Sequence, residues 1–375
     1  MKKILVYAIL VRFIPLLILS SMLMIYPAQP VQMVNGSSLL WNKRYNEVAY
    51  PATHNGHSHT ESPVQNQSLS IKEQLQQGIR ATKLHVYYHG EKKGEYIPYV
   101  CHGVGREMVD GEYMEKVVDK VPRLFRSWAR DALKQLAPLN ELVRDACQVA
   151  YGCDTQKGVI PFKHCILDPS RRSLVDTFGD IKQFLQTTRN EVVTVILEDH
   201  TQNLEAIAKD LNDSGLVKYM HTQDKSKQWP TLGEMVKSDK RLVVLLHGDE
   251  KLPYQKHPGL HYVWDFAWDT EWNFNDANHL NDNQKDVMPK RGMQAFKDRN
   301  DGVKNKLFIV HHFVTELTGG SKNEAKKVNK KGFLKTRLER LAKQAGHIPN
   351  IVQVDFFEVA SNDVLDVINE FNGKK

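Results

Sequence analysis

The protein has 375 residues, of which 41% are hydrophobic and 25% are charged, so it carries enough apolar side chains to bury a sizeable core. A formal net charge of +7 favours anionic partners, such as a phospholipid or another phosphodiester substrate, or a membrane surface. No nucleic-acid-binding motif accompanies this charge, so nucleic acid is not an expected partner, and a monomer is the expected state.

The N-terminal segment predicts export. Residues 13–25 form an uncharged, mainly apolar run some way after Lys2 and Lys3. This run is short for a membrane span and has the length of a signal-peptide core. Residues 1–28 are therefore predicted to be a signal peptide, with Ala28 at the cleavage site, or an uncleaved N-terminal anchor. The expected location is secreted, periplasmic, or anchored on the extracytoplasmic side of a membrane.

Short apolar runs along the rest of the chain predict buried strands. They are rich in Val, Ile and Leu and do not alternate with polar residues, which suits a parallel sheet covered on both faces. The runs are residues 48–50, 81–87, 99–101, 192–197, 242–246, 307–310 and 351–354.

Helical stretches lie between these runs. Capping-box patterns begin at Ser70 and at Thr231, each with Glu three residues further on. Residues 174–185 and 333–345 have apolar residues three and four apart, and Gly346 stands where a helix would end.

The alternation of strands and helices predicts an α/β protein. We expect a (β/α) TIM-type barrel, distorted, over residues 38–373. Residues 104–163 break the alternation and predict a helical insertion within the barrel, after the third strand.

The four cysteines fit an oxidising compartment. Three pairings are possible. Cys147 and Cys153 are close enough to close a short loop, so we expect them to pair with each other and Cys101 to pair with Cys165.

Polar residues follow six of the predicted strands. Any one of them is most often only the first solvated position after a buried strand. In a parallel barrel, however, all these strand ends meet on one face, where catalytic groups gather. The residues are His85, His102, Glu198, Asp199, His200, His247, Asp249, His311, His312 and Asp355.

Two histidines on such a face suit the cleavage of a phosphodiester by an adjacent hydroxyl. One imidazole takes the proton of the attacking hydroxyl, and the other gives a proton to the leaving oxygen. A carboxylate behind the base would fix its tautomer, and the charge on the phosphate needs a metal ion or a fixed Lys or Arg.

The chain resembles the X domain of phosphatidylinositol-specific phospholipases C, above all the compact single-domain relatives of bacteria and fungi. The resemblance runs from about Trp41 to Gly373 with its motifs in order, excepting the insertion. The matching segments are residues 45–55, 70–80, 101–103, 190–198, 229–235, 307–313 and 349–358.

This resemblance implies a distorted TIM barrel that cleaves its substrate through a cyclic inositol phosphate. His54 matches the general base, His102 the general acid, and Asp355 the carboxylate that supports the base in the bacterial enzymes. Asn55 and Glu198 match two calcium ligands of the animal enzymes.

The sequence departs from the family at Lys83 and His85, where carboxylates usually stand. Calcium prefers oxygen ligands, so these two changes argue against calcium. Lys83 could instead supply the positive charge directly, with His85 and Asn55 also contacting the phosphate, in a mechanism without a cofactor. Alternatively, His85, Glu198 and Asn55 could hold a transition metal such as zinc.

The sequence therefore predicts an exported phosphodiesterase that cleaves an inositol-type phospholipid, or a related head group, by acid–base catalysis with two histidines. Two other functions stay open. One is a non-catalytic barrel that binds anionic lipid, and the other is a metal-dependent glycerophosphodiesterase.

Overall fold

The computed structural model describes residues 32–62, 64–92, 95–102, 168–282, 305–316 and 319–374. The predicted signal peptide or anchor (1–28), the predicted insertion (104–163) and three of the four cysteines lie outside these residues, so those predictions stay predictions. In the described part of the chain, no helix is both long and apolar enough to cross a membrane.

Within the described residues, the core of the fold is a sheet of eight parallel strands that follow one another in chain order around a barrel. This arrangement confirms the predicted TIM-type barrel. The strands are β1 (Tyr50–Thr53), β2 (Ala81–Lys92), β5 (Val193–Asp199), β6 (Leu242–His247), β7 (Leu260–Tyr262), β8 (Ala267–Asp269), β9 (Leu307–His312) and β12 (Ile351–Val354).

The barrel is distorted where β7 and β8 face each other. These two strands are the ends of the hydrogen-bonded order, and in the described part of the chain no ladder joins them. The four-residue helix α9 (Val263–Phe266) connects them instead. Each strand has only three residues, which is too short to give the apolar pattern that marks a strand in a sequence.

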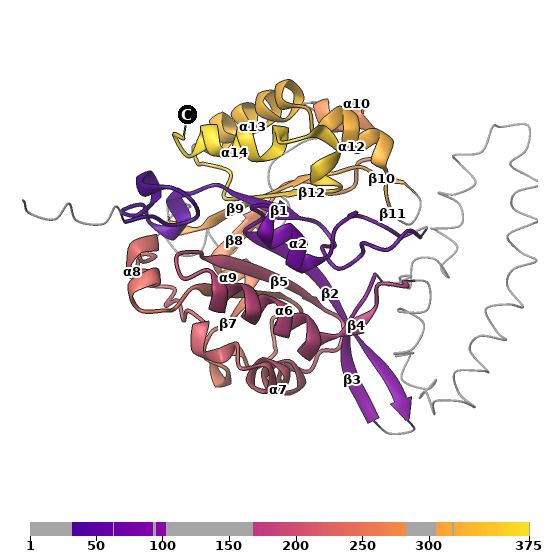
Figure 1. Ribbon diagram of the computed structural model, residues 1–375, viewed down its shortest axis with the longest axis vertical. Helices are drawn as coiled ribbons and strands as arrows, with labels where there is room; N and C mark the ends of the chain where they lie inside the picture. The colour runs from indigo at the N-terminus through magenta and orange to yellow at the C-terminus, as the bar shows by residue number, and fades with distance from the viewer. Residues whose placement is uncertain are drawn as a thin grey trace, which may run out of the picture. The chain divides into compact units, whose positions relative to one another are not determined.

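The predicted strand at residues 99–101 is not a barrel strand. It belongs to β3 (Glu95–Val100), which runs antiparallel to β2 and pairs Val100 with Val86. The reason is the short connection, because a parallel pair needs a crossover of a dozen or more residues. The two-residue strand β4 (Arg172–Ser173) continues this antiparallel edge. Figure 1 shows the β2–β3 hairpin extending beyond the barrel strands.

Helices cover the outside of the barrel, with α6 and α7 on one side of the strands and α13 and α14 on the other (Figure 1). Both predicted capping boxes are present, at Ser70 and at Thr231. The α-helices are α2 (Ile71–Gln76), α6 (Leu174–Thr187), α7 (Leu204–Ser214), α8 (Leu232–Lys237), α10 (Ala277–Asn281), α12 (Lys322–Val328), α13 (Lys331–Ala345) and α14 (Asp363–Phe371).

Shorter elements complete the described residues. The 3-10 helices are η1 (Ser38–Leu40), η2 (Tyr45–Glu47), η7 (Val217–Tyr219), η8 (Tyr254–Lys256) and η10 (Phe357–Ala360), and the strands β10 (Thr315–Glu316) and β11 (Gly319–Gly320) form a separate two-stranded sheet.

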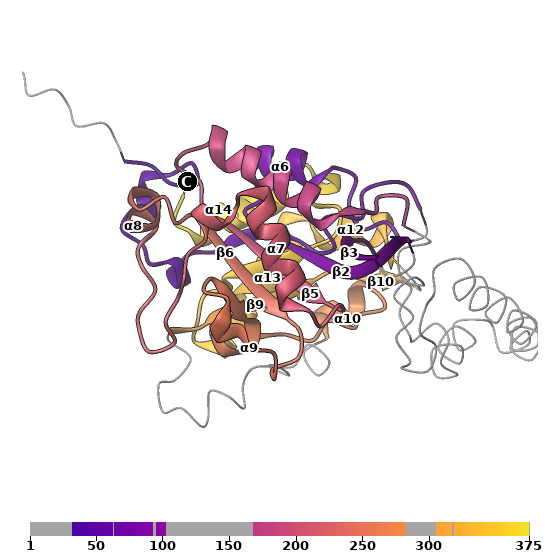
Figure 2. The same cartoon turned by 90° about the horizontal axis from the view of Figure 1, so that it is seen from below.

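The alternation of side chains along each strand separates two apolar layers. In β5, Val193, Val195 and Leu197 point outward and join the cluster formed with α6 and α7, and Figure 2 shows these helices lying over β5 and β6. Ile196 points into the barrel and joins a second cluster that fills the amino-terminal half of the interior. The next inward position is Glu198, so the interior changes from apolar to polar at the carboxyl ends of the strands.

Candidate active site

The carboxyl ends of the barrel strands bring together most of the polar residues singled out in the sequence. We call this set of inward-facing side chains the mouth cluster. Strand register explains part of it, because His85 lies opposite Glu198 on β5, and Glu198 lies opposite His247 on β6. The members are His54, Lys83, His85, Glu198, His247, Asp269, His311 and Asp355.

His54, directly after β1, is held by a buried carboxylate. Its Nδ1 lies 3.0 Å from Oδ1 of Asp355, which directly follows β12. The other carboxylate oxygen of Asp355 accepts a hydrogen bond of 3.1 Å from Nδ2 of Asn66. The imidazole also stacks on Phe313, with ring centroids 3.7 Å apart. These contacts fix the ring, and its Nε2 has no hydrogen-bond partner among the described residues.

The protonation of His54 follows from its surroundings. Burial lowers the pKa of His54 well below its usual value, and the positive charges of Lys83 and His102 act in the same direction. The imidazole is therefore neutral near pH 7. In the tautomer that donates from Nδ1 to Asp355, Nε2 carries a lone pair and can accept a proton.

His102 enters the same mouth from the β2–β3 hairpin. The backbone N–H of Cys101 donates to the carbonyl of His85, which ties the end of β3 to β2. The backbone N–H of His102 donates to Oδ2 of Asp168 at 2.6 Å. The rings of His102 and His85 have centroids 5.7 Å apart. His102 also lowers the pKa of His54 through its charge, so the two imidazoles lie within electrostatic reach of each other.

Glu198 is the centre of a group of cationic and imidazole side chains. Its Oε2 lies 2.5 Å from Nζ of Lys83, 3.7 Å from Nε2 of His85 and 3.7 Å from Nδ1 of His247. Its Oε1 lies 3.4 Å from Nε2 of His200. Burial alone would raise the pKa of Glu198, but the charges of His85 and Lys83 outweigh burial and hold this pKa well below its usual value. Glu198 is therefore an anion that holds Lys83 in place.

Asn55, the other residue predicted to contact phosphate or metal, is buried beside His54. Its backbone has a positive φ of 46°, a conformation that asparagine tolerates better than most residues. Its Nδ2 donates to Oδ1 of Asn66 at 3.1 Å. Its Oδ1 is buried and has no partner in the described part of the chain, so this carbonyl oxygen could accept a hydrogen bond from a ligand.

The predicted metal ligands Asn55, Glu198 and His85 do not fit calcium. Calcium takes six to eight oxygen ligands, whereas the predicted ligands offer only the carboxylate of Glu198 and the amide oxygen of Asn55. The ammonium of Lys83 already occupies one oxygen of Glu198. Imidazole nitrogens with a carboxylate are instead the ligands that zinc prefers. One atom each of His85, Glu198 and His200 lie within 4.8 Å of one another.

Some predicted strand-end residues do not belong to the mouth. The side chain of Asp199 accepts hydrogen bonds from Thr201, in the turn after β5. His312 alternates with His311 and points outward from the barrel, where its Nε2 donates to the carbonyl of Val328 at 2.9 Å. His311 points inward, but both of its ring nitrogens are occupied, one by Gln353 and the other by Asp269.

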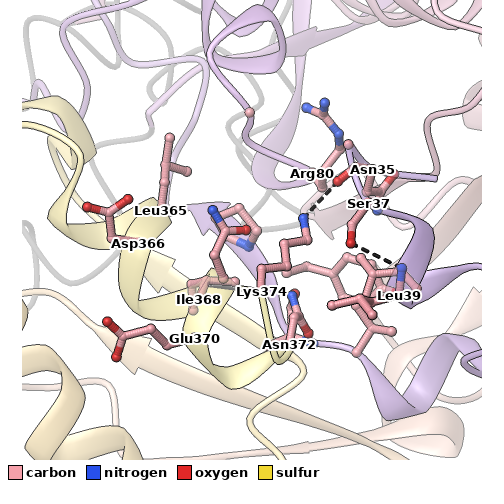
Figure 3. A pocket seen from close by; sticks show the side chains of 18 of the residues that line it. Asn35, Ser37, Leu39, Arg80, Leu365, Asp366, Ile368, Glu370, Asn372 and Lys374 are labelled. Carbon is pink, nitrogen blue, oxygen red and sulfur yellow. Dashed lines mark hydrogen bonds between the residues drawn. The ribbon is translucent and has the colours of Figure 1, made fainter. Parts of the chain in front are cut away.

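A cleft of about 1250 Å³ lies at the opposite end of the barrel. It is lined by the start of β1, by side chains of the segment 77–80 before β2 and by α14. Figure 3 shows Lys374 in this cleft, where its Nζ donates to the carbonyl of Asn35 at 2.8 Å. Arg80, also in this cleft, is paired with Glu191 at 2.7 Å. Lys374 and Arg80 are thus already bound by groups of the protein, so we place the candidate site at the mouth.

Asn66 and Asp168 were not identified from the sequence. Each supports a predicted catalytic residue from a distant part of the chain, with Asn66 bound to Asp355 and Asp168 bound to His102. Neither is part of an apolar pattern or a strand end, so the sequence carries no signal that marks them.

Comparison with known proteins adds independent information. The family model for the PI-PLC X domain matches residues 40–131 and 150–372. A PI-PLC X domain-containing protein of Arabidopsis thaliana is 22% identical over 207 residues, which cover 53% of this chain and 44% of that protein. The match therefore spans less than half of the length of that relative.

Solved structures of bacterial enzymes have a similar fold. A mutant of the phosphatidylinositol-specific phospholipase C from Staphylococcus aureus has a TM-score of 0.50 at 13% identity, covering 93% of this chain and 99% of that one. The phosphatidylinositol-specific phospholipase C from Listeria monocytogenes has a TM-score of 0.49 at 15% identity, covering 89% of this chain and 96% of that one. At 13% identity, the similarity to the Staphylococcus aureus enzyme is one of fold alone.

Proposed function

The chain belongs to the PI-PLC X domain family, and from this membership we propose that it is a phosphodiesterase acting on an inositol-type phospholipid or a related head group. The family and the barrel support phosphodiesterase chemistry in general. The observation that carries the finer proposal is the contact between His54 and Asp355 in the same mouth as His102.

In the proposed reaction, His54 is the general base. The head-group hydroxyl next to the phosphate gives its proton to Nε2 of His54 as its oxygen forms a bond to phosphorus. Asp355 accepts the Nδ1–H of the same ring, which keeps Nε2 as the basic atom and stabilises the imidazolium that forms. Asn66 holds the second oxygen of Asp355, so the carboxylate does not turn away.

His102 is the proposed general acid. The bond between phosphorus and the lipid oxygen breaks as His102 gives a proton to that oxygen, and the product is a cyclic phosphate. Asp168 accepts from the backbone of His102 and fixes the start of the segment that carries this imidazole. The two proton transfers leave His54 protonated and His102 neutral, so a water molecule that opens the cyclic phosphate could restore both.

Lys83 is the proposed source of positive charge on the phosphate. Its ammonium reaches the mouth and lowers the pKa of His54 through its charge, so it stands near the base. Glu198 orients it at 2.5 Å. His85 and Asn55 complete the proposed phosphate contacts, and a fixed cation of this kind stabilises charge that develops in the transition state.

We further propose that the enzyme is exported and works at a membrane surface. Residues 1–28 have the pattern of a signal peptide or anchor, and the net charge of +7 favours an anionic surface. The predicted disulfides, Cys101 with Cys165 and Cys147 with Cys153, would suit such a compartment.

The test is turnover of a panel of phosphodiesters presented in vesicles, including phosphatidylinositol, phosphatidylcholine and glycerophosphodiesters. We expect a water-soluble cyclic phosphate from the inositol lipid, with and without a chelator, and its loss in His54→Ala and His102→Ala. His257→Ala is the matched control, because His257 pairs with Glu205 outside the mouth cluster.

The panel also separates the alternatives. Binding to anionic vesicles without turnover of any substrate would favour the non-catalytic lipid-binding barrel. Turnover of glycerophosphodiesters alone, abolished by a chelator, would favour the glycerophosphodiesterase. Full activity of His102→Ala would contradict the proposed mechanism.

A further inference from the structure

We propose that His85, Glu198 and His200 form a binding site for a divalent transition metal of the zinc class, in which the metal competes with Lys83 for the carboxylate of Glu198. This site differs from the set expected from the sequence, because His200 rather than Asn55 supplies the third ligand. It goes beyond the proposed phosphodiesterase activity, since it concerns binding alone.

The spacing of the three donor atoms fits a tetrahedral ion. Zinc bonds of about 2.0–2.1 Å meeting at the tetrahedral angle place ligand atoms about 3.3 Å apart. Nδ1 of His85 lies 3.0 Å from Nε2 of His200, and Nε2 of His200 lies 3.4 Å from Oε1 of Glu198. Nε2 of His85 lies 3.7 Å from Oε2 of Glu198, and one ligand atom from each of the three residues lies within 4.8 Å of the others. Small rotations of the side chains would therefore complete the triangle.

The rings of the two histidines are also held in place by stacking. His85 stacks on His200 with centroids 5.3 Å apart and planes 3° apart. His200 stacks on Tyr87 with centroids 4.2 Å apart and planes 1° apart, which holds its ring in place. A site whose ligands are already oriented loses less conformational freedom when the ion binds.

Lys83 is the competitor. Its Nζ lies 2.5 Å from Oε2 of Glu198, so an ammonium ion already neutralises the carboxylate. A metal on Glu198 would stand next to this positive charge and would be repelled by it. We therefore infer a site of reduced affinity, which selects ions that bind imidazole strongly over calcium, an ion that depends on oxygen ligands.

The experiment is isothermal titration calorimetry of the chelator-treated protein, without a histidine tag, against zinc chloride and against calcium chloride. We expect one zinc ion per chain and no calcium binding. Loss of a group that only supports a metal ligand costs about 10–100-fold in affinity. His200→Ala, which removes a ligand, should therefore weaken zinc binding by at least about 100-fold.

Lys83→Met is the decisive variant, because it should strengthen zinc binding by at least about tenfold by removing the competing charge. His257→Ala is the matched control and should leave the affinity unchanged. It removes a histidine that is paired with Glu205, outside the proposed metal site. Thermal melting of each variant shows whether it is folded; if His200→Ala is not, His200→Gln takes its place.

Three results would overturn the inference: no zinc binding by the wild type, zinc binding unchanged in the folded His200 variant, or weaker zinc binding in Lys83→Met. These results are separate from those that test the proposed function. A wild type that binds zinc and cleaves no phosphodiester would uphold this inference and contradict the phosphodiesterase, and the converse holds for an active protein that binds no zinc.

Discussion

Two of the buried histidine–carboxylate pairs in the described part of the barrel differ in one respect that bears on their roles. His54 lies 3.0 Å from Asp355, and His311 lies 2.9 Å from Asp269. All four side chains are buried at strand ends. The second nitrogen of His311, however, lies 3.0 Å from Oε1 of Gln353, whereas the second nitrogen of His54 has no hydrogen-bond partner among the described residues.

The comparison shows that pairing with a carboxylate does not by itself make a histidine catalytic. The His311 pair joins β8, β9 and β12 through side chains, and the backbone N–H of His311 also bonds to Thr270. Its ring has no nitrogen left for a substrate, so we assign it a structural role in the mouth. In the proposed mechanism, the His54 pair uses one nitrogen for orientation and the other to accept the proton.

The largest effect in a test of these two assignments is expected when each histidine is removed in turn. His54→Ala should lower turnover by about 10⁴-fold, the upper end of the range for a general base. Added imidazole should restore part of this activity, since it can enter the space left beside Asp355 and accept the proton. Initial rates at increasing concentrations of imidazole provide the measurement.

His311→Ala is the matched variant for the rescue experiment. Because its ring has no nitrogen left for the substrate, imidazole should not change its rate. Rescue of His311→Ala, with none for His54→Ala, would reverse the assignment of the two pairs.

Replacing the carboxylate of each pair tests the same comparison, with smaller expected effects on turnover. Asp355→Asn should lower turnover by about 10²-fold, because the amide no longer fixes the tautomer of His54 or stabilises the imidazolium. Asp269→Asn should have a much smaller effect on turnover, measured as kcat/KM on the same substrate. Equal losses in the two variants would mean that the His311 pair also takes part in the reaction.

The effect on the free energy of unfolding should have the opposite order, with the larger loss for the His311 pair. His311→Ala removes the hydrogen bonds of a buried ring to Asp269 and Gln353, and hydrogen bonds to charged groups are worth about 1.5–3 kcal/mol each. From the bond to Asp269 alone, we expect the free energy of unfolding to fall by about 1.5–3 kcal/mol, as measured by denaturant titration. If His311→Ala is as stable as the wild type, its structural role is disproved.

The barrel could be predicted from the sequence because its signals are local. Apolar runs mark β5, β6, β9 and β12, and the capping residues Ser70 and Thr231 mark the starts of α2 and α8. The same local reasoning failed for β3, because an apolar run does not report the direction of its neighbour. It also missed β7 and β8, whose three residues are too few to show a strand pattern.

The candidate site was only partly predictable, because its supporting contacts join distant positions. Resemblance to a family pointed to His54 and Asp355, which lie 301 positions apart in the sequence. Asn66 carries no comparable mark, although it lies 289 positions from the carboxylate that it supports. Likewise, the pairing of Lys83 with Glu198 depends on the register of β2 and β5, which a single sequence does not give.

The acid limb of the pH profile gives the finest test of the His54 pair. Burial and the charges of Lys83 and His102 lower the pKa of His54 below its usual value of about 6.5. A base must be unprotonated to act, so kcat/KM should fall only below pH 6.5 as the pH decreases. Lys83→Met removes one of the lowering charges, so the acid limb of its residual activity should move to higher pH. A limb that stays in place, or moves to lower pH, would mean that Lys83 does not act on the base through its charge, and that burial alone keeps His54 neutral.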